Sequence, residues 1–225
     1  MREKGWDIAI AEARYGRPAA PGSIVPGVAP AAVENLREIW SQVFAPAHRS
    51  RGYCLLVTAA EMDEGVSQIT TGLGLAGVQA EPDRRIAIVD FNLRRPRIAG
   101  LFRIPAVPGI ADVLEGSLPM DEAPVQTQEM SLDIVPAGCL NGHTPSAFPQ
   151  AAAAALLDRL REDYDHILVD APAVNHSDMT TELASLADGV LLVIKTGSTR
   201  REAVVEARLR LDRAGAHIVG AVLNA

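Results

Sequence analysis

The chain has 225 residues, 48% of them hydrophobic, and a formal net charge of −7 at pH 7. This length and apolar content predict one full hydrophobic core, in one domain with an N-terminal extension. The acidic balance speaks against non-specific binding to nucleic acid. No apolar stretch reaches the ~20 residues that span a bilayer, and the start of the chain lacks the pattern of a signal peptide.

The residues that bind metals or form disulfides are few and scattered. Cys54 falls in a predicted buried strand and Cys139 in a predicted loop, which fits a reducing cytosol and gives no metal-binding spacing. The five histidines are spread along the chain, so a zinc site has no support. We therefore expect a cytoplasmic protein that reaches the inner membrane only through a partner.

The first 30 residues differ from the rest in composition. Residues 5–15 predict a short helix with Trp6, Ile10 and Ala13 on one face. Residues 16–30 contain four prolines and three glycines and predict a linker. Such a helix either docks on a partner or folds back on its own domain, and both alternatives stay open. We divide the chain into this segment, 1–30, and a main domain, 31–225.

Strands and helices alternate through the main domain. Helical spacing of apolar residues predicts a first helix over 31–44. The other predicted helices are 66–80, 109–115, 147–163, 180–186 and 200–214, and the predicted strands are 53–58, 85–89, 132–135, 166–169, 190–194 and 218–223. Strands rich in Val, Ile and Leu that are separated by helices are typical of a parallel sheet covered on both faces. We predict a three-layer α/β/α fold with a mostly parallel sheet.

Residues 55–68 have the frame of a phosphate-binding loop without its lysine. A buried strand enters the loop, Gly65 closes it, and an apolar helix follows. A Walker A loop reads G-x-x-x-x-G-K-S/T, and here Val66 takes the lysine position, with Ser67 after it. The backbone amides and the helix N-terminus still favour an anion. The ammonium group that grips the terminal phosphates is missing.

Little in the composition replaces that ammonium group. Only two of the 21 basic residues are lysines, Lys4 and Lys195. Lys195 follows an apolar strand, at the sheet edge where α/β proteins bind their ligands. An ordinary surface lysine in an arginine-rich chain is the commoner case, so we expect no rescue by Lys195.

Two predicted strands end in aspartate beside the loop. Asp90 and Asp170 both stand at the carboxyl end of an apolar strand. Magnesium bound with nucleotide phosphates takes one or two carboxylates and a Ser or Thr hydroxyl, so Ser67, Asp90 and Asp170 form a sensible ligand set. One such aspartate is weak support because Asp is frequent in turns. Two of them beside a glycine loop favour descent from a nucleotide hydrolase.

From residue 55 to residue 224 the chain resembles the cytosolic domain of bacterial tyrosine autokinases (BY-kinases). Residues 89–96 are similar to the family's second Walker motif, D-x-D-L-R-R-P, and residues 101–116 to its LF-x-x-P…PGL-x-DVL-x-G segment. Residues 132–138, 170–172 and 186–193 match further landmarks in the same order. That family regulates capsule and exopolysaccharide assembly and is related to the plasmid-partition and septum-site ATPases. The resemblance implies a P-loop NTPase-like fold of the deviant Walker type.

The resemblance also implies roles for individual residues. It implies that Gly65, Val66 and Ser67 line a site for ATP or ADP with Mg²⁺, and that Asn224 contacts the adenine. Asp90 and Asp170 would be catalytic if the chain is active. The family's E-x-x-R-x-x-R assembly motif is present as Glu34 and Arg37, with Trp40 in third place. With them, Arg94 and Arg95 are candidates for an oligomer or partner contact.

The departures from the family pattern fall on catalytic positions. Asp63 replaces a glycine, Gln68 a threonine and Asn92 the second aspartate of the D-x-D pair. The three tyrosines, at 15, 53 and 164, form no cluster of the kind that the family phosphorylates. Losing the lysine contact costs about 1.5–3 kcal/mol, and a carboxylate at Asp63 about 5 Å from a phosphate adds about 3 kcal/mol of repulsion. Together these weaken a nucleotide site by roughly 10³-fold, and only the loss of the lysine contact applies if Asp63 faces solvent.

We therefore expect a pseudokinase that acts as a partner in exopolysaccharide biosynthesis and export, with weak or absent ATP or ADP binding. Its partner would be the cytosolic tail of a membrane polysaccharide co-polymerase, an active kinase of the same family, or another copy of itself. One alternative is an active kinase or ATPase that uses Lys195 or an arginine of residues 94–97. Another is a partition-type switch, which is less favoured because no membrane-binding or DNA-binding tail is evident.

Overall fold

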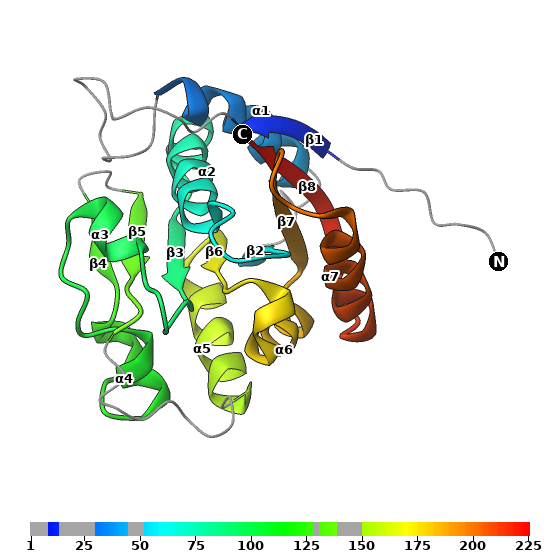
Figure 1. The fold of residues 1–225 in the computed structure, drawn as a ribbon. Coiled ribbons are helices and arrows are strands. Elements are labelled where there is room, and N and C mark those ends of the chain that lie inside the picture. The colour runs from blue at the N-terminus through cyan, green and yellow to red at the C-terminus, as the bar shows by residue number, and fades with distance from the viewer. Residues whose placement is uncertain (1–8, 14–29, 45–51, 128–130, 139–149) are drawn as a thin grey trace.

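The computed structural model describes residues 9–13, 30–44, 52–127, 131–138 and 150–225. They form an eight-stranded sheet with the strand order β1-β8-β7-β2-β6-β3-β5-β4, in which all neighbours are parallel except β4 and β5 (Figure 1). The strands are β1 (Ala9–Ala13), β2 (Tyr53–Ala59), β3 (Ile86–Asp90), β4 (Val125–Gln126), β5 (Leu132–Val135), β6 (His166–Asp170), β7 (Gly189–Lys195) and β8 (Ile218–Asn224).

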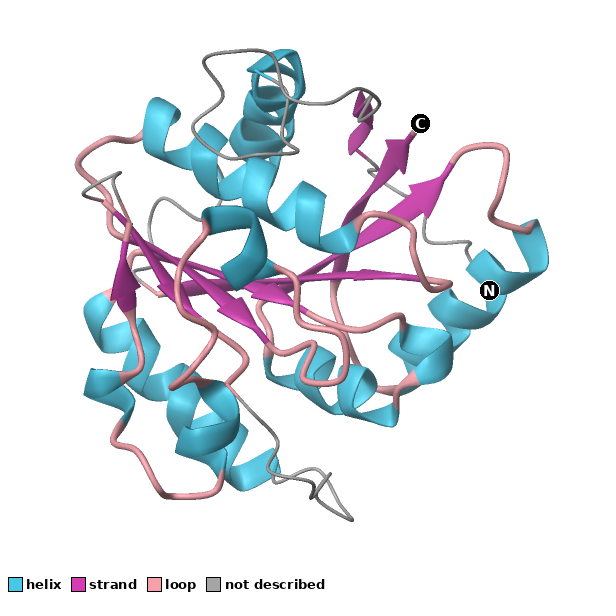
Figure 2. Ribbon diagram, turned by 60° about the vertical axis from the view of Figure 1, so that its left-hand side comes forward, coloured by secondary structure: helices cyan, strands magenta, loops and turns pink. Residues whose placement is uncertain are grey.

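Helices cover both faces of the sheet, as Figure 2 shows. They are α1 (Pro30–Phe44), α2 (Val66–Ala80), α3 (Ile98–Phe102), α4 (Ile110–Leu114), α5 (Gln150–Asp163), α6 (Asp178–Leu186) and α7 (Arg201–Arg213), with the 3₁₀ turns η2 (Met120–Glu122) and η3 (Val174–His176). The predicted three-layer α/β/α fold with a mostly parallel sheet is confirmed.

Two hydrophobic clusters form the core, one on each face of the sheet. Successive residues of a strand point to opposite faces, so Cys54 and Leu56 pack with α5, α6 and α7, while Leu55 and Val57 pack with α1 and α2. Burial raises the pKa of the Cys54 thiol to about 12, so this cysteine behaves as a core residue. Cys139 lies outside the described residues.

The prediction for residues 5–15 is wrong where the structure describes them. Ala9–Ala13 forms strand β1, which pairs in parallel with β8, from Ala9 beside Gly220 to Ala13 beside Asn224. A short isolated helix pays for nucleation with few hydrogen bonds, whereas the exposed edge of β8 offers a row of unpaired backbone groups. The segment thus folds back on its own domain. The predicted linker lies almost wholly outside the described residues, and the boundary at residue 30 stays a prediction.

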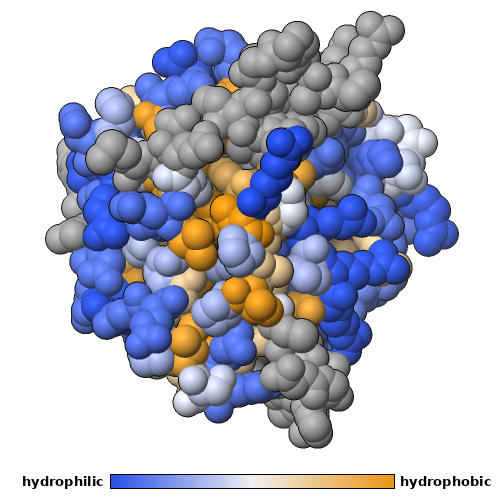
Figure 3. Space-filling view, turned by 90° about the vertical axis from the view of Figure 1, so that its left-hand side faces the viewer, coloured by the Kyte–Doolittle hydropathy of each residue, from blue (hydrophilic) through white to orange (hydrophobic). Residues whose placement is uncertain are grey.

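The other predicted elements agree with the structure to within a few residues, and the differences lie in short elements. Helix α3, strand β4 and the two 3₁₀ turns were not predicted, because each has five residues or fewer and shows no clear period. On the side formed by α3, α4 and β4, apolar surface gathers between polar residues (Figure 3). Val107, in the segment between α3 and α4, is 52% exposed. Among the described residues, no helix is long and apolar enough to cross a membrane.

Candidate functional site

The predicted phosphate loop joins β2 to α2 at the carboxyl edge of the sheet. Gly65 stands at the N-cap of α2 with φ +90°, in the left-handed region that favours glycine. A Cβ atom at this position would lie 2.2 Å from Nδ2 of Asn224. Gly65 is therefore required both for the turn and for the close approach of β8.

Asn224 fastens the loop to the last strand. It is 5% exposed, and its Nδ2 donates to the Glu64 carbonyl oxygen at 2.8 Å. Its Oδ1 is buried without a hydrogen-bond partner among the described residues. The structure thus brings Asn224 to the loop, with one polar atom left for a ligand, and its contact with an adenine stays a prediction.

Asp90 and Asp170 lie side by side at the ends of β3 and β6, in register and fully buried. Asp170 Oδ2 accepts a hydrogen bond from Ser67 Oγ at 2.7 Å, while its Oδ1 has no partner within the described part of the chain. The Asp90 oxygens accept from the backbone amides of Asn92 at 3.0 Å and of Arg97 and Ile98 at 3.1 Å. A hydroxyl beside a buried carboxylate with a free oxygen fits Mg²⁺. The predicted set of Ser67, Asp90 and Asp170 is thus brought together, with Asp90 also ordering the turn after β3.

Burial makes both carboxyl groups hard to ionise. It raises the pKa of Asp90 to about 6, against the lowering effect of its three backbone hydrogen bonds. The pKa of Asp170 is also raised, first by burial and then by the charge of Asp90. When two carboxylates lie side by side, the negative charge of one makes the other bind a proton more readily. The pair is therefore suited to a divalent cation or to a proton.

Glu64 is a buried site residue that the sequence did not single out. It is 3% exposed, its Oε2 accepts from the Ala60 amide at 3.2 Å, and its Oε1 accepts from the Thr199 hydroxyl. Burial raises the pKa of Glu64, and these hydrogen bonds oppose the rise. Thr199 is 135 residues away in the chain, so no local pattern pointed to the contact. Glu64 thus ties the loop to the segment between β7 and α7.

The two other acidic residues of the loop contact His176 and Arg95 in neighbouring loops. Glu61 Oε2 lies 2.6 Å from His176 Nε2, and this contact lowers the pKa of Glu61. Asp63 adopts φ +60° and is 71% exposed, with its Oδ2 3.6 Å from Arg95 Nη1. The sequence left open whether Asp63 faces the phosphate site or solvent. Its exposure and its arginine partner reduce its repulsion of a phosphate.

No lysine reaches the loop in the described structure. Val66 is partly buried against the core cluster on the α1–α2 face, and its carbonyl accepts from Thr70 Oγ1 at 2.9 Å. Lys195 ends β7 in register with Asn224, with an exposed side chain. Among the described residues, no hydrogen bond or ion pair joins its ammonium group to the loop. The expectation that Lys195 gives no rescue therefore stands as a prediction.

The residues of the assembly motif separate into exposed and buried members. Glu34 and Arg37 form an exposed ion pair at 3.3 Å on α1. Trp40 is 1% exposed, donates from Nε1 to Glu81 Oε1 at 2.9 Å and covers Gly77 of α2. The third motif position thus fixes α1 to its own domain. Arg94 is exposed, and Arg95 contacts Asp63 as described above.

Comparison with known proteins adds relatives by sequence and by fold. No family model matches the chain. It is 26% identical to tyrosine-protein kinase YwqD of Bacillus subtilis over 170 residues, which cover 76% of this chain and 71% of the relative. It is 24% identical to tyrosine-protein kinase etk of Escherichia coli over 204 residues, but these are only 28% of that much longer protein.

Solved structures share the fold. The kinase domain of Escherichia coli tyrosine kinase ETK superposes with a TM-score of 0.77 at 23% identity, over 86% of this chain and 75% of that one. The cell division protein MinD of Aquifex aeolicus gives 0.62 at 20% identity, over 76% and 69%. Cobyrinic acid a,c-diamide synthase of Mycobacterium smegmatis, with bound ADP and magnesium, gives 0.59 at 19%, over 76% and 71%. The chain is therefore a homologue of the bacterial tyrosine-protein kinases, built on the P-loop fold that they share with MinD.

Proposed function

We propose that the chain is a BY-kinase-like pseudokinase that serves as a partner or regulator in exopolysaccharide biosynthesis and export. One observation carries the proposal: an ordered phosphate loop, with Gly65 and Ser67 in place, holds Val66 where the phosphate-gripping lysine belongs. Asn92, in place of the second aspartate of the D-x-D pair, removes a further catalytic group. The scaffold is kept while the groups that carry out phosphoryl transfer are lost.

The residues present fit the Mg²⁺ of a magnesium nucleotide better than they fit its phosphates. Ser67 and Asp170 offer oxygens for Mg²⁺, which when bound would neutralise phosphate charge. The loop offers amides but no ammonium group, and losing that one contact weakens nucleotide binding by about 10- to 100-fold. Transition-state stabilisation falls by a further 10²–10³ or so for the missing donor. We therefore expect weak nucleotide binding and no useful catalysis.

A domain that keeps this fold without catalysis is expected to act by binding another protein. The partly exposed apolar surface over α3, α4 and β4 is of the kind that marks protein contacts (Figure 3). We propose as partner the cytosolic segment of a membrane polysaccharide co-polymerase, an active kinase of the same family, or a second copy of the chain. The chain would then lie on the cytoplasmic side of the inner membrane, held there by the partner.

Calorimetric titration with ATP and ADP, with and without Mg²⁺, tests the nucleotide part of the proposal. We expect no heat or millimolar binding in the wild-type chain. Val66→Lys should raise the affinity about tenfold or more, because the missing charge-assisted contact is restored in a sound pocket. Val66→Gln, of similar length but neutral, is the matched control and should gain little. Micromolar, magnesium-dependent binding by the wild type would contradict the proposal.

A second function, an active tyrosine kinase or ATPase with a rerouted loop, is favoured by the names of the relatives, which are tyrosine-protein kinases. It predicts phosphate release or tyrosine phosphorylation that is lost in both Asp90→Ala and Asp170→Ala. It also predicts that Val66→Lys gains little affinity. The proposed pseudokinase shows neither activity above the level of the two alanine variants.

A further inference from the structure

One segment of the chain, residues 91–111, is basic and apolar although the protein as a whole is acidic. It contains no aspartate or glutamate, against a net charge of −7 for the chain, and its arginines stand at positions 94, 95, 97 and 103. It runs from the end of β3 through α3 into the first turn of α4. Asp90, just before it, is fully buried, and Asp112, just after it, turns its Oδ2 to the Gly109 amide at 2.8 Å. The segment is therefore a local region of positive charge.

Two of the arginines share the outer face of α3. Arg97 and Arg103 cap the two ends of this helix, and Gly100 lies midway between them. All three are exposed and three residues apart, a spacing that places side chains on one side of a helix. A Cβ atom at Gly100 would have no neighbouring atom within 4 Å. The outer face of α3 is thus open, with a guanidinium group at each end.

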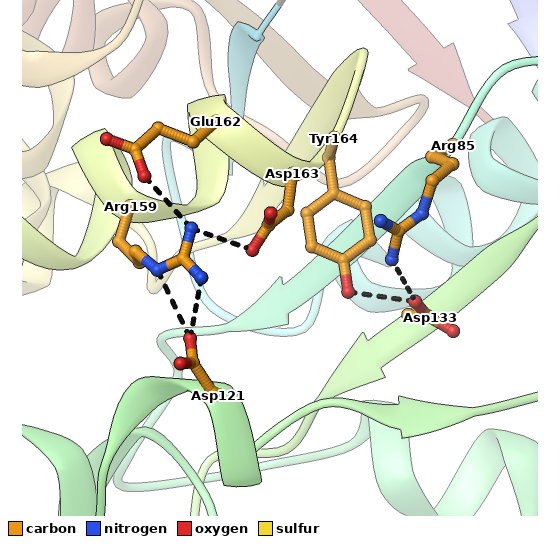
Figure 4. A network of polar contacts seen from close by, with 7 residues as sticks. All are labelled: Arg85, Asp121, Asp133, Arg159, Glu162, Asp163 and Tyr164. Carbon is orange, nitrogen blue, oxygen red and sulfur yellow. Dashed lines mark hydrogen bonds and ion pairs between the residues drawn. The ribbon is translucent and has the colours of Figure 1, made fainter.

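The arginines of the segment are little engaged within the chain. Elsewhere in the molecule, Arg85 and Arg159 contact carboxylates (Figure 4). By contrast, no ion pair or hydrogen bond within the described residues involves the side chains of Arg94, Arg97 or Arg103. Arg95 meets only the exposed Asp63, at 3.6 Å. Three positive charges are therefore available to a ligand outside the chain.

Exposed apolar residues follow directly after α3. Residues 105–108, Pro-Ala-Val-Pro, are all exposed, and the side chain of Val107 is 52% exposed. The Ala106 carbonyl accepts from the Gly138 amide at 3.1 Å, which fastens this loop to the segment after β5. The two prolines restrict the backbone further. Because the loop is already fixed, little conformational freedom is lost when it binds a surface.

We propose that the outer face of α3 and the loop 105–108 bind the surface of a membrane rich in anionic phospholipid. Lipid phosphates attract arginines near a membrane, and exposed apolar side chains enter the boundary between headgroups and acyl chains. Such a contact needs an open face and no groove. Neither the cavity at α7 nor the cleft beside β5 includes residues of this segment. An acidic peptide is less favoured, because peptides bind in grooves or along sheet edges.

This inference goes beyond the proposed function, because it requires neither a nucleotide nor a protein partner. It adds a direct membrane contact to the contact through a partner that the sequence predicts. The proposed protein partner keeps the apolar surface over α4 and β4.

Flotation of the full chain with lipid vesicles tests the proposal. The vesicles contain phosphatidylcholine alone or phosphatidylcholine and phosphatidylglycerol in equal amounts. We expect binding to the mixed vesicles only, and its loss in about 0.5 M salt, because salt screens the attraction between guanidinium groups and phosphates. Equal binding to both kinds of vesicle, or no binding to the mixed ones, would overturn the proposal.

Two variants at Gly100 change the charge of the face without a clash. Gly100→Lys and Gly100→Glu introduce long side chains of opposite charge into open space. Gly100→Lys should strengthen binding to the mixed vesicles about fivefold, the usual effect of one basic residue at an anionic membrane, and Gly100→Glu should weaken it. An unchanged affinity in both variants would show that α3 does not face the lipid.

Variants on α7 are the control for net charge and for exposed apolar surface. Arg94→Gln with Arg97→Gln should weaken binding about 20-fold. Arg201→Gln with Arg213→Gln removes the same charge from exposed positions of α7 and should have a much smaller effect. Val107→Ser should weaken binding severalfold. Val205→Ser, at a position on α7 that is 49% exposed, should leave binding unchanged. Equal losses in the segment and on α7 would contradict the inference.

Polyglutamate tests the other class of anionic partner. We expect the wild-type chain to bind the mixed vesicles and to bind polyglutamate weakly or not at all. Binding of polyglutamate without binding of the mixed vesicles would assign the segment to an acidic protein and overturn the membrane proposal. The pseudokinase proposal is tested separately by nucleotide titration, so a failure of one proposal is distinguishable from a failure of the other.

Discussion

Asp90 and Asp170 make the stability of the fold depend on pH in a direction opposite to that of most carboxylates. The pKa of Asp90 is about 6 in the folded chain, against 3.8 when exposed, and the pKa of Asp170 is raised as well. The folded state therefore binds protons more tightly than the unfolded state. This contribution to stability is fully present below about pH 4 and falls as the pH rises toward 6.

Asp170→Asn should therefore raise the melting temperature at neutral pH, because a neutral amide removes the cost of ionising a buried group beside Asp90. The fall in melting temperature between pH 4 and 6 should also become smaller than in the wild type. Thermal unfolding of both proteins across this range measures the two effects. The exposed Asp158→Asn is the control for loss of one charge. A lower melting temperature of Asp170→Asn at pH 7 would show that the pair is already neutralised in another way.

Gly65 offers a test of the backbone at the loop. Gly65→Ala combines a positive φ with a Cβ that would lie 2.2 Å from Asn224, so we expect a loss of about 2 kcal/mol or more of unfolding free energy. Gly197→Ala has φ +71° but no atom within 4 Å, and isolates the backbone effect, which should be about 1 kcal/mol. Urea unfolding gives both values. Equal losses in the two variants would mean that Asn224 moves aside without cost.

Site residues could be predicted from the sequence where a motif or a strand end marks them, and not where they depend on a partner far away in the chain. Gly65, Ser67, Asp90 and Asp170 stand at strand ends or in a spaced motif, and a parallel sheet brings such positions to one edge. The partner of Glu64 is Thr199, at a separation of 135 residues, and that of Glu61 is His176. Such pairs depend on side-chain burial and on the packing of loops, which a period or a motif does not encode.

At the scale of elements, α1 shows how one residue fixes a helix. Trp40 stacks on Phe44 with ring centroids 4.0 Å apart, and a Cβ at Gly77 would lie 2.4 Å from the Trp40 ring. The helical spacing predicted which side of α1 is buried. It did not predict that the indole nitrogen would find Glu81 at the far end of α2.

Trp40→Phe should cost about 1 kcal/mol or more of unfolding free energy, because it leaves Glu81 without this donor. Trp40→Ala should cost about 3–5 kcal/mol, because it also empties a packed site. Glu34→Ala, which breaks only the exposed pair with Arg37, should change stability by less than about 0.5 kcal/mol. Chemical denaturation of the three variants measures the series. A small effect of Trp40→Ala would show that α1 is not fixed through this residue.

Strand β1 shows why an element at the edge of a sheet escapes sequence analysis. The five residues Ala-Ile-Ala-Glu-Ala have apolar residues that fit a helix as well as a strand, and only the free edge of β8 decides between them. The buried strands β2, β3, β5, β6, β7 and β8 show the opposite case. Their Val, Ile and Leu content and the helices between them indicated a single fold class. The predicted boundaries agree with the structure to within a few residues.

At the scale of the whole molecule, the N-terminal strand closes one end of the sheet. Deletion of residues 1–13 should expose the edge of β8 and increase self-association, because an unpaired edge is a template for another strand. Size-exclusion chromatography over a range of concentrations measures the effect. An unchanged monomer with an unchanged melting temperature would mean that β1 adds nothing to the protection of this edge.

The contacts of the phosphate loop reach four different neighbours. Glu61 meets the turn after β6, Asp63 the turn after β3, and Glu64 both the segment after β7 and, through its carbonyl, the end of β8. Side chains of the chain itself thus join the loops that surround a P-loop site. Under the proposed function these contacts hold the loops in one arrangement, so a partner meets the same protein surface whatever the cell's ratio of ATP to ADP. The assembly it regulates would then respond to how much of this protein is made, and not to the energy state of the cell.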